Sequence, residues 1–349
     1  MAGSLTGVSS LVSSRGWETW SGASWSRPDL ETRIRRSIVR FVVAAIVIAV
    51  AVAIFYVSRA DAPGRAHQST SSSTTPTSTS TSTVNYAAGF YLDIGASASL
   101  GMQPTGIPAH NGHRTKTGYS DDVVSLESAN GISLDMREIG CPGETVQSIL
   151  GQLKDACYTL PNTQLTIATD YLHAHHSEIG VVTIDLGFNN IRPCLTPTLT
   201  DESCVSQGVA AVRKYLPTIM SRLQRAAGPL VHFVGLEYSD PFLAYYLGGS
   251  SGRVIAQQGL VAMNEMNSVL GSVFRASAVS VADVPAAFLN ESVRPVTMAN
   301  VGTVPENVAR ACAGSWMCTP PPFGPDDHPN NVGYLIIARA VVAQLPRTW

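Results

Sequence analysis

Charged side chains are scarce in this chain of 349 residues: Asp, Glu, Lys and Arg make up 14% of it, and the formal net charge is -2. Nucleic-acid binding usually requires a basic surface, and a pI near 6.4 gives no sign of one. We therefore expect no nucleic-acid partner. Hydrophobic residues make up 45% of the chain, which suffices for one large folded domain or two small ones.

The sequence also lacks any Cys-x-x-Cys pair, and its cysteine spacings do not fit a structural zinc finger. The six cysteines instead form three close pairs. These pairs predict three local disulfides, Cys141 with Cys157, Cys194 with Cys204, and Cys312 with Cys318. An even number of cysteines is typical of an exported protein in an oxidising compartment.

One long hydrophobic run is present, at residues 38–57, with Arg40 as its only charge. Its length suits a membrane-spanning helix. Arginines are denser before the run than after it, so we expect a transmembrane signal anchor with residues 1–37 as a disordered cytoplasmic tail and the rest of the chain extracellular. A cleaved signal peptide is the alternative, because residues 60–62 (Ala-Asp-Ala) resemble a cleavage site; the protein would then be secreted.

Residues 58–85 are rich in Ser and Thr and predict an unfolded linker. We expect residues 86–349 to form one folded domain, and we expect the protein to be a monomer. Apolar runs there predict strands at residues 90–94, 180–186, 230–236 and 278–284. Helices are expected at residues 144–156, 205–226, 254–274 and 331–345, with a possible kink at Pro217 and a long irregular stretch before the last helix. This alternation favours an α/β fold, a three-layer α/β/α sandwich with a mostly parallel sheet.

A serine follows the first predicted strand in the turn Gly95-Ala96-Ser97-Ala98-Ser99-Leu100-Gly101. The carboxyl edge of a parallel sheet is where ligands usually bind, so Ser97 is a candidate nucleophile. A serine needs a base and a donor set for the oxyanion. Gly and Ser also gather in turns for backbone reasons alone, which is the simpler interpretation of this motif.

A histidine with two neighbouring carboxylates, Asp326-Asp327-His328, precedes the last predicted helix. An imidazole that takes a proton from serine needs an acidic partner to fix its tautomer, and Asp326 lies two residues away on the same side of an extended chain. Capping of the helix by the Asp and Asn residues is the structural alternative.

Two glycine-containing segments could supply oxyanion donors. Gly143 lies in Cys141-Pro142-Gly143-Glu144, and Asn189 follows the strand at residues 180–186 in Gly187-Phe188-Asn189-Asn190. A backbone N–H and an amide side chain are suitable donors for an oxyanion. Ordinary turns explain both segments equally well.

In this order, Gly95-x-Ser97, Gly143, Gly187-x-Asn189 and His328 resemble the Ser, Gly, Asn and His blocks of SGNH hydrolases, a branch of the GDSL esterases and lipases. Secreted actinobacterial members are the most similar. The resemblance implies a flavodoxin-like fold without metal or organic cofactor. It implies that Ser97 is the nucleophile, that His328 is the base, and that Ser97, Gly143 and Asn189 form the oxyanion hole.

Three positions depart from the family pattern. Ala96 and Asn190 stand where the family usually has Asp, and Pro325 stands where its acid usually lies. We assign the acid to Asp326, with a Ser-His dyad as the alternative. The expected function is hydrolysis of an ester, or of an acylated lipid or glycan, at the cell envelope. An acyltransferase using the same site, or a non-catalytic envelope-binding module, are the alternatives.

Overall fold

The computed structural model describes residues 87–107, 112–154 and 156–346. The predicted cytoplasmic tail (1–37), membrane span (38–57) and Ser/Thr-rich linker (58–85) all precede these residues, so they lie outside the described part of the chain. Within the described ranges, no helix is both long enough and apolar enough to cross a membrane.

A five-stranded parallel sheet forms the centre of the fold, in the order β2-β1-β3-β4-β5. This is the strand order of flavodoxin-like doubly wound proteins. The strands are β1 (Ala87–Gly95), β2 (Ile132–Glu138), β3 (Gly180–Asp185), β4 (Val231–Leu236) and β5 (Ser280–Ala282). Every residue of the central strand β3 is buried, which explains its continuous apolar sequence. The four predicted strands are confirmed, and β2 was not predicted.

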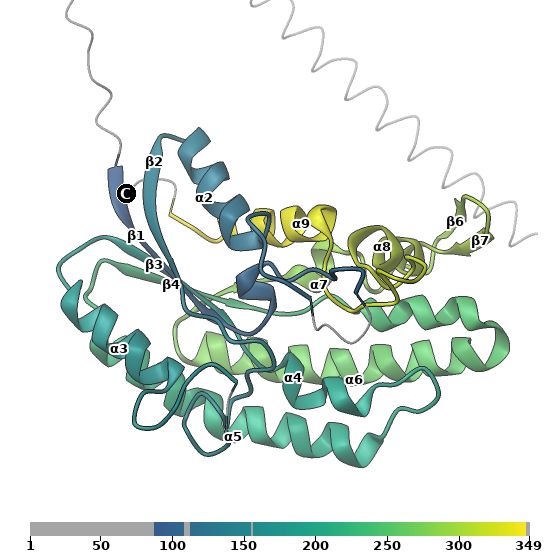
Figure 1. The fold of residues 1–349 in the computed structure, drawn as a ribbon, viewed down its shortest axis with the longest axis horizontal. Helices are drawn as coiled ribbons and strands as arrows, with labels where there is room; N and C mark the ends of the chain where they lie inside the picture. Colours follow the sequence, from purple (N-terminus) through teal and green to yellow (C-terminus); the bar gives the residue numbers. More distant parts are fainter. Residues whose placement is uncertain (1–86, 108–111, 155, 347–349) are drawn as a thin grey trace, which may run out of the picture. The chain divides into compact units, whose positions relative to one another are not determined.

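Helices cover both faces of the sheet, which gives the predicted three-layer α/β/α sandwich (Figure 1). One face carries α3 (Gln164–Ala174), α5 (Glu202–Ala226) and α6 (Gly249–Ala276). The other face carries α2 (Tyr119–Ala129), α7 (Val284–Ala287) and α9 (Asn331–Val342). The apolar stripe of α5 is buried as its spacing predicts, and the helix continues through Pro217.

Two sequence predictions are wrong. Where a helix is predicted at residues 144–156, residues 144–154 form turns and bends. There Thr145 N–H donates to Ser148 Oγ at 2.9 Å and Ser148 N–H donates to Thr145 Oγ1 at 3.1 Å, and such local bonds compete with helical ones. The stretch before the last helix is also more ordered than predicted, because it contains the antiparallel ribbon β6 (Pro295–Met298) and β7 (Gly302–Pro305), followed by α8 (Glu306–Gly314).

Short elements at the carboxyl edge of the sheet complete the fold. They are the 3-10 helices η1 (Ala98–Leu100), η2 (Arg192–Cys194) and η3 (Pro241–Gly248), and the single-turn helix α4 (Phe188–Ile191). Three disulfides join Cys141 to Cys157, Cys194 to Cys204, and Cys312 to Cys318, the three neighbouring pairs expected from the sequence.

These disulfides close loops of different length, with sequence separations of 16, 10 and 6. A longer loop loses more entropy in the unfolded chain when it is cross-linked. Replacing both Cys141 and Cys157 by Ala should therefore lower the free energy of unfolding by about 3 kcal/mol, and replacing both Cys312 and Cys318 by about 2 kcal/mol. Urea denaturation of the folded domain measures both values, and the reverse ranking would contradict the loop-entropy argument.

Candidate active site

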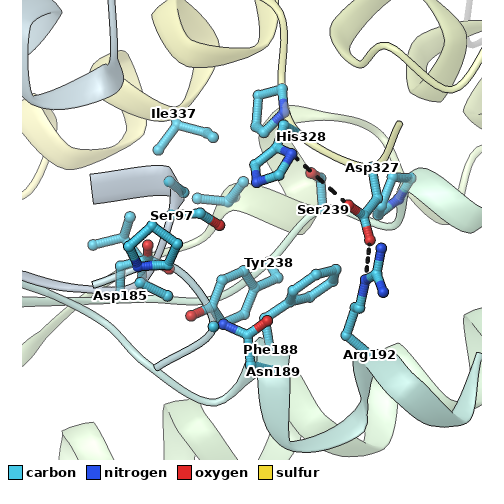
Figure 2. Close-up of a pocket in the computed structure, with 18 of the residues that line it drawn as sticks. Ser97, Asp185, Phe188, Asn189, Arg192, Tyr238, Ser239, Asp327, His328 and Ile337 are labelled. Carbon is cyan, nitrogen blue, oxygen red and sulfur yellow. Dashed lines mark hydrogen bonds and ion pairs between the residues drawn. The ribbon is translucent and has the colours of Figure 1, made fainter. Parts of the chain in front are cut away.

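A cavity of about 510 Å³ opens at the carboxyl edge of the sheet. Its walls come from the turn after β1, the segment after β3, the end of β4 and the loop before α9. Ser97, Gly143, Asn189, Asp326 and His328 all line it. Figure 2 shows His328 and Ser97 on the same side of this hollow, with Asn189 and Phe188 opposite. Residues far apart in the sequence thus meet at the predicted edge of the sheet.

Ser97 lies in the turn that leaves β1, directly before η1. Its carbonyl accepts hydrogen bonds from the N–H groups of Leu100 at 3.2 Å and Met102 at 3.1 Å. Gly101 ends the turn with a φ of 57°, a left-handed conformation that favours glycine. The backbone is therefore held by its own bonds, and the half-buried Ser97 side chain projects toward the cavity.

Close packing explains the glycine that precedes the serine. A Cβ at Gly95 would lie 2.5 Å from the carbonyl oxygen of Asp185 on the neighbouring strand. The buried side chain of Gln164 also holds the backbone of Gly95, because Oε1 accepts its N–H at 3.0 Å and Nε2 donates to its carbonyl at 2.9 Å. The turn that carries Ser97 therefore starts from a fixed point.

Asp185, the last residue of β3, is a buried carboxylate at the base of the cavity. Its Oδ2 accepts the N–H of Ser99 at 3.2 Å, which ties the turn after β1 to β3. Burial raises the pKa of Asp185, and contacts with Tyr238, the amides of Ala96 and Ser99, and His328 oppose that rise. A carboxylate from β3 therefore supports the turn that contains Ala96 and Ser97.

His328 is paired with Asp326 on the loop before α9. The distance between His328 Nδ1 and Asp326 Oδ1 is 2.8 Å, and the same oxygen accepts the N–H of His328 at 2.9 Å. This leaves Nε2 as the ring nitrogen available to a substrate or nucleophile. Asn330 caps α9, because its Oδ1 accepts the N–H groups of Val332 and Gly333. Capping thus falls to Asn330 and leaves Asp326 to the imidazole.

Opposing effects set the pKa of His328. Burial lowers it, while the hydrogen bond and charge of Asp326, and the charge of Asp327, raise it, with a net rise above the ordinary 6.5. For Asp326, burial raises the pKa, but the interactions with His328 outweigh this and lower it below 3.8. The arrangement stabilises the imidazolium form that appears whenever the ring takes up a proton.

Asp327 has a different partner. Its Oδ2 accepts the Nε–H of Arg192 at 2.7 Å, and its Oδ1 lies 4.0 Å from His328 Nδ1. Asp326, Asp327 and His328 each have a polar side-chain atom within 4.8 Å of one another. The bond between Asp326 and His328 and the cation of Arg192 already satisfy these groups within the protein.

Gly143 and Asn189 line the wall near Ser97. Gly143 has a φ of 83°, a conformation that favours glycine. A Cβ there would meet no atom within 4 Å, so no other group covers the backbone on the side where a side chain would project. Asn189 follows Gly187, whose φ is 123°. The Nδ2 of Asn189 donates one hydrogen to the carbonyl of Glu144 at 3.1 Å, which leaves the second hydrogen for another acceptor.

The sequence analysis did not identify Asp185, Arg192 or Glu237 as cavity residues, although all three line it. Burial, with the charge of Asp283, raises the pKa of Glu237 to about 7. A lone Asp at the end of an apolar strand was a usable signal for Asp185. No sequence signal joins Arg192 to Asp327, since the two are 135 residues apart.

No protein-family model and no curated protein sequence matches this chain. Similar solved structures include phospholipase A1 from Streptomyces albidoflavus NA297, with 21% identity and a TM-score of 0.45 over 74% of this chain and 100% of that one. An extracellular lipase from Streptomyces rimosus has 19% identity and a TM-score of 0.44 over 72% and 99%. An acetylxylan esterase from Geobacillus stearothermophilus has 17% identity and a TM-score of 0.39 over 74% and 95%.

The pairing with Asp326 predicts a measurable pKa change. In the native protein the pKa of His328 should lie above 6.5, and Asp326→Asn should lower it because the main stabilising charge and acceptor are lost. A ¹H–¹⁵N titration of the histidine rings measures both pKa values, with His328→Gln used to assign the resonance. An unchanged His328 titration would contradict this pairing.

Proposed function

We propose that this chain is a serine ester hydrolase of the SGNH type, with Ser97 as nucleophile, His328 as general base and Asp326 as the acid. The observation that carries the proposal is that a serine on the turn after β1 and a histidine paired with a carboxylate line one cavity. These are the parts that nucleophilic acyl transfer requires, since a free hydroxyl is a weak nucleophile without a base.

In the proposed reaction His328 Nε2 takes the proton of Ser97 as Oγ attacks the ester carbonyl carbon. The tetrahedral intermediate collapses, the C–O bond to the alcohol breaks, and the imidazolium returns its proton to that alcohol. Water then attacks the acyl-enzyme with the same proton transfers and releases the acid. Because the neutral ring is the base, activity should rise with pH through the pKa of His328.

The oxyanion would be held by the N–H groups of Ser97 and Gly143 and by Asn189 Nδ2. Gly143 supports this role because its backbone faces the cavity without side-chain cover. Asn189 supports it because its bond to the carbonyl of Glu144 orients the amide and leaves one hydrogen. Donors fixed before the reaction need no reorganisation when charge develops on the substrate oxygen.

The proposed setting is the outer side of the cell envelope. Three disulfides suit an oxidising compartment. The hydrophobic run at residues 38–57 would tether the domain, with residues 58–85 as a spacer, and cleavage of that run would release it. Transfer of the acyl group to a sugar hydroxyl would use the same acyl-enzyme, and product analysis with an added alcohol distinguishes transfer from hydrolysis.

Replacement of the nucleophile tests the proposal directly. Ser97→Ala should lower kcat on a p-nitrophenyl ester by at least about 10⁴-fold and abolish labelling by a fluorophosphonate, because the attacking oxygen is gone. Ser99→Ala is the matched control, since the Ser99 hydroxyl donates to the Ala96 carbonyl at 2.7 Å and should not be the labelled group. A wild-type protein that neither reacts nor hydrolyses would instead indicate a non-catalytic binding module.

The oxyanion assignment has a built-in control in the two adjacent asparagines. Asn189→Ala should lower kcat by about 10²- to 10³-fold with little change in KM, as loss of one oxyanion donor does. Asn190 faces away from the cavity, where its Nδ2 donates to Gln147 Oε1 at 2.7 Å. Steady-state kinetics should therefore show a much smaller loss for Asn190→Ala. Equal losses in the two variants would argue against Asn189 as a donor.

A further inference from the structure

Two carboxylates flank His328, yet only one of them bonds to the ring. Asp326 Oδ1 lies 2.8 Å from Nδ1, whereas the nearer oxygen of Asp327 lies at 4.0 Å. Asp327 is the more buried of the two, with 9% of its side chain exposed against 25% for Asp326. A buried carboxylate needs a partner, and the Nε–H of Arg192 supplies it at 2.7 Å.

Arg192 comes from the segment that carries the proposed oxyanion donor. It opens η2 directly after α4, which contains Asn189. The bond from Asn189 to the carbonyl of Glu144 anchors one end of this segment. The disulfide between Cys194 and Cys204 anchors the other end to α5. The bond to Asp327 then joins the same segment to the loop of His328, as Figure 2 shows.

We infer that Arg192 is a positioning residue of this site: its ion pair with Asp327 holds the second carboxylate off His328 and fixes the Asn189 segment against the His328 loop. The inference rests on the proposed function. Without Arg192, Asp327 would be an unpaired buried charge whose nearest remaining cationic partner is the imidazolium of His328. It would then compete with Asp326 for the ring and turn Nε2 out of line with Ser97.

The charges around the ring make this role measurable. Asp326 and Asp327 face His328 from its own loop, Arg192 faces it from η2, and Asp185 interacts with it from β3. Tyr245 of η3 lies near the ion pair and is neutral in the working range, since burial raises its pKa. Asp327 raises the pKa of His328 and Arg192 lowers it. Loss of Asp327 should therefore lower that pKa, and loss of Arg192 should raise it.

A purely structural ion pair would give a different pattern. Arg192 has 54% of its side chain exposed, and pairs with an exposed partner contribute little to folding stability. Thermal unfolding should therefore change only slightly when the pair is removed. A loss of kcat with KM and the unfolding temperature nearly unchanged, beside a shift of the His328 midpoint, is not expected of a pair that only supports the fold.

The experiment uses four variants of the full chain: Arg192→Gln, Arg192→Lys, Asp327→Asn and the double variant Arg192→Gln/Asp327→Asn. Arg213→Gln, an exposed arginine on α5, is the matched control. The His328 titration is followed by ¹H–¹⁵N spectroscopy, which needs no activity, and kcat and KM are measured on a p-nitrophenyl ester. Unfolding temperatures are recorded for all variants.

Arg192→Gln should raise the His328 titration midpoint and lower kcat about tenfold with KM nearly unchanged, because small misplacement of reacting groups costs rate and not binding. Asp327→Asn should lower the midpoint. The double variant should return the midpoint close to the wild-type value. Arg192→Lys keeps the charge, so its midpoint should lie near the wild-type value and its kcat between those of the wild type and Arg192→Gln.

Shifts of the same sign in Arg192→Gln and Asp327→Asn, or a wild-type titration and kcat in Arg192→Gln, would overturn the inference. If Arg192→Gln fails to fold, the different midpoints expected for Asp327→Asn (lowered) and for the double variant (close to wild type) still decide it. A wild-type protein that hydrolyses no ester and takes no fluorophosphonate would refute the proposed function, while the midpoints would still report whether the ion pair controls the ring.

Discussion

The site depends on the backbone of Gly95. Its carbonyl accepts the N–H of Cys141 at 3.0 Å and the Nε2–H of Gln164 at 2.9 Å, and its own N–H donates to Gln164 Oε1. Ser97 follows Gly95 by two residues along the chain. Gly143 follows Cys141, whose N–H is bonded to Gly95, by two residues. Only a residue without a Cβ fits here against β3. The proposed nucleophile and a proposed oxyanion donor are therefore placed by one buried residue whose backbone N–H and carbonyl are both hydrogen-bonded.

The second constraint is electrostatic, because three of the carboxylates that line the cavity interact with one imidazole, which also interacts with one arginine. Asp326 bonds to the ring, Asp327 bonds to Arg192, and Asp185 bonds to the turn after β1. Like charges in a partly buried site repel, so each carboxylate needs its own donor. The separate partners let the carboxylates lie close together without sharing one proton or one cation, and they leave Nε2 of His328 facing the cavity.

The sequence predicted the sheet and the long helices because those elements bury regular apolar patterns, as in β3 and α5. Five residues chosen from the sequence, Ser97, Gly143, Asn189, Asp326 and His328, also line the cavity. The helix prediction failed at residues 144–156, where Thr145 and Ser148 replace helical bonds with local ones. The sequence could not reveal the pairing of Arg192 with Asp327, because a contact between distant loops produces no periodic pattern of residues.

The disulfides show how those loops are held where the sheet ends. Backbone beyond a strand loses its ladder bonds, and three of the loops that line the site have a disulfide beside them. Cys141 is two residues before Gly143, Cys194 ends the segment of Asn189 and Arg192, and Cys312–Cys318 encloses Trp316, whose N–H donates to the carbonyl of His328 at 3.1 Å. The turn of Ser97 has none, but it leaves the inner strand β1 and is bonded to β3 through Asp185. Cross-links therefore occur where the sheet cannot supply rigidity, and the serine needs none because the sheet supplies it directly.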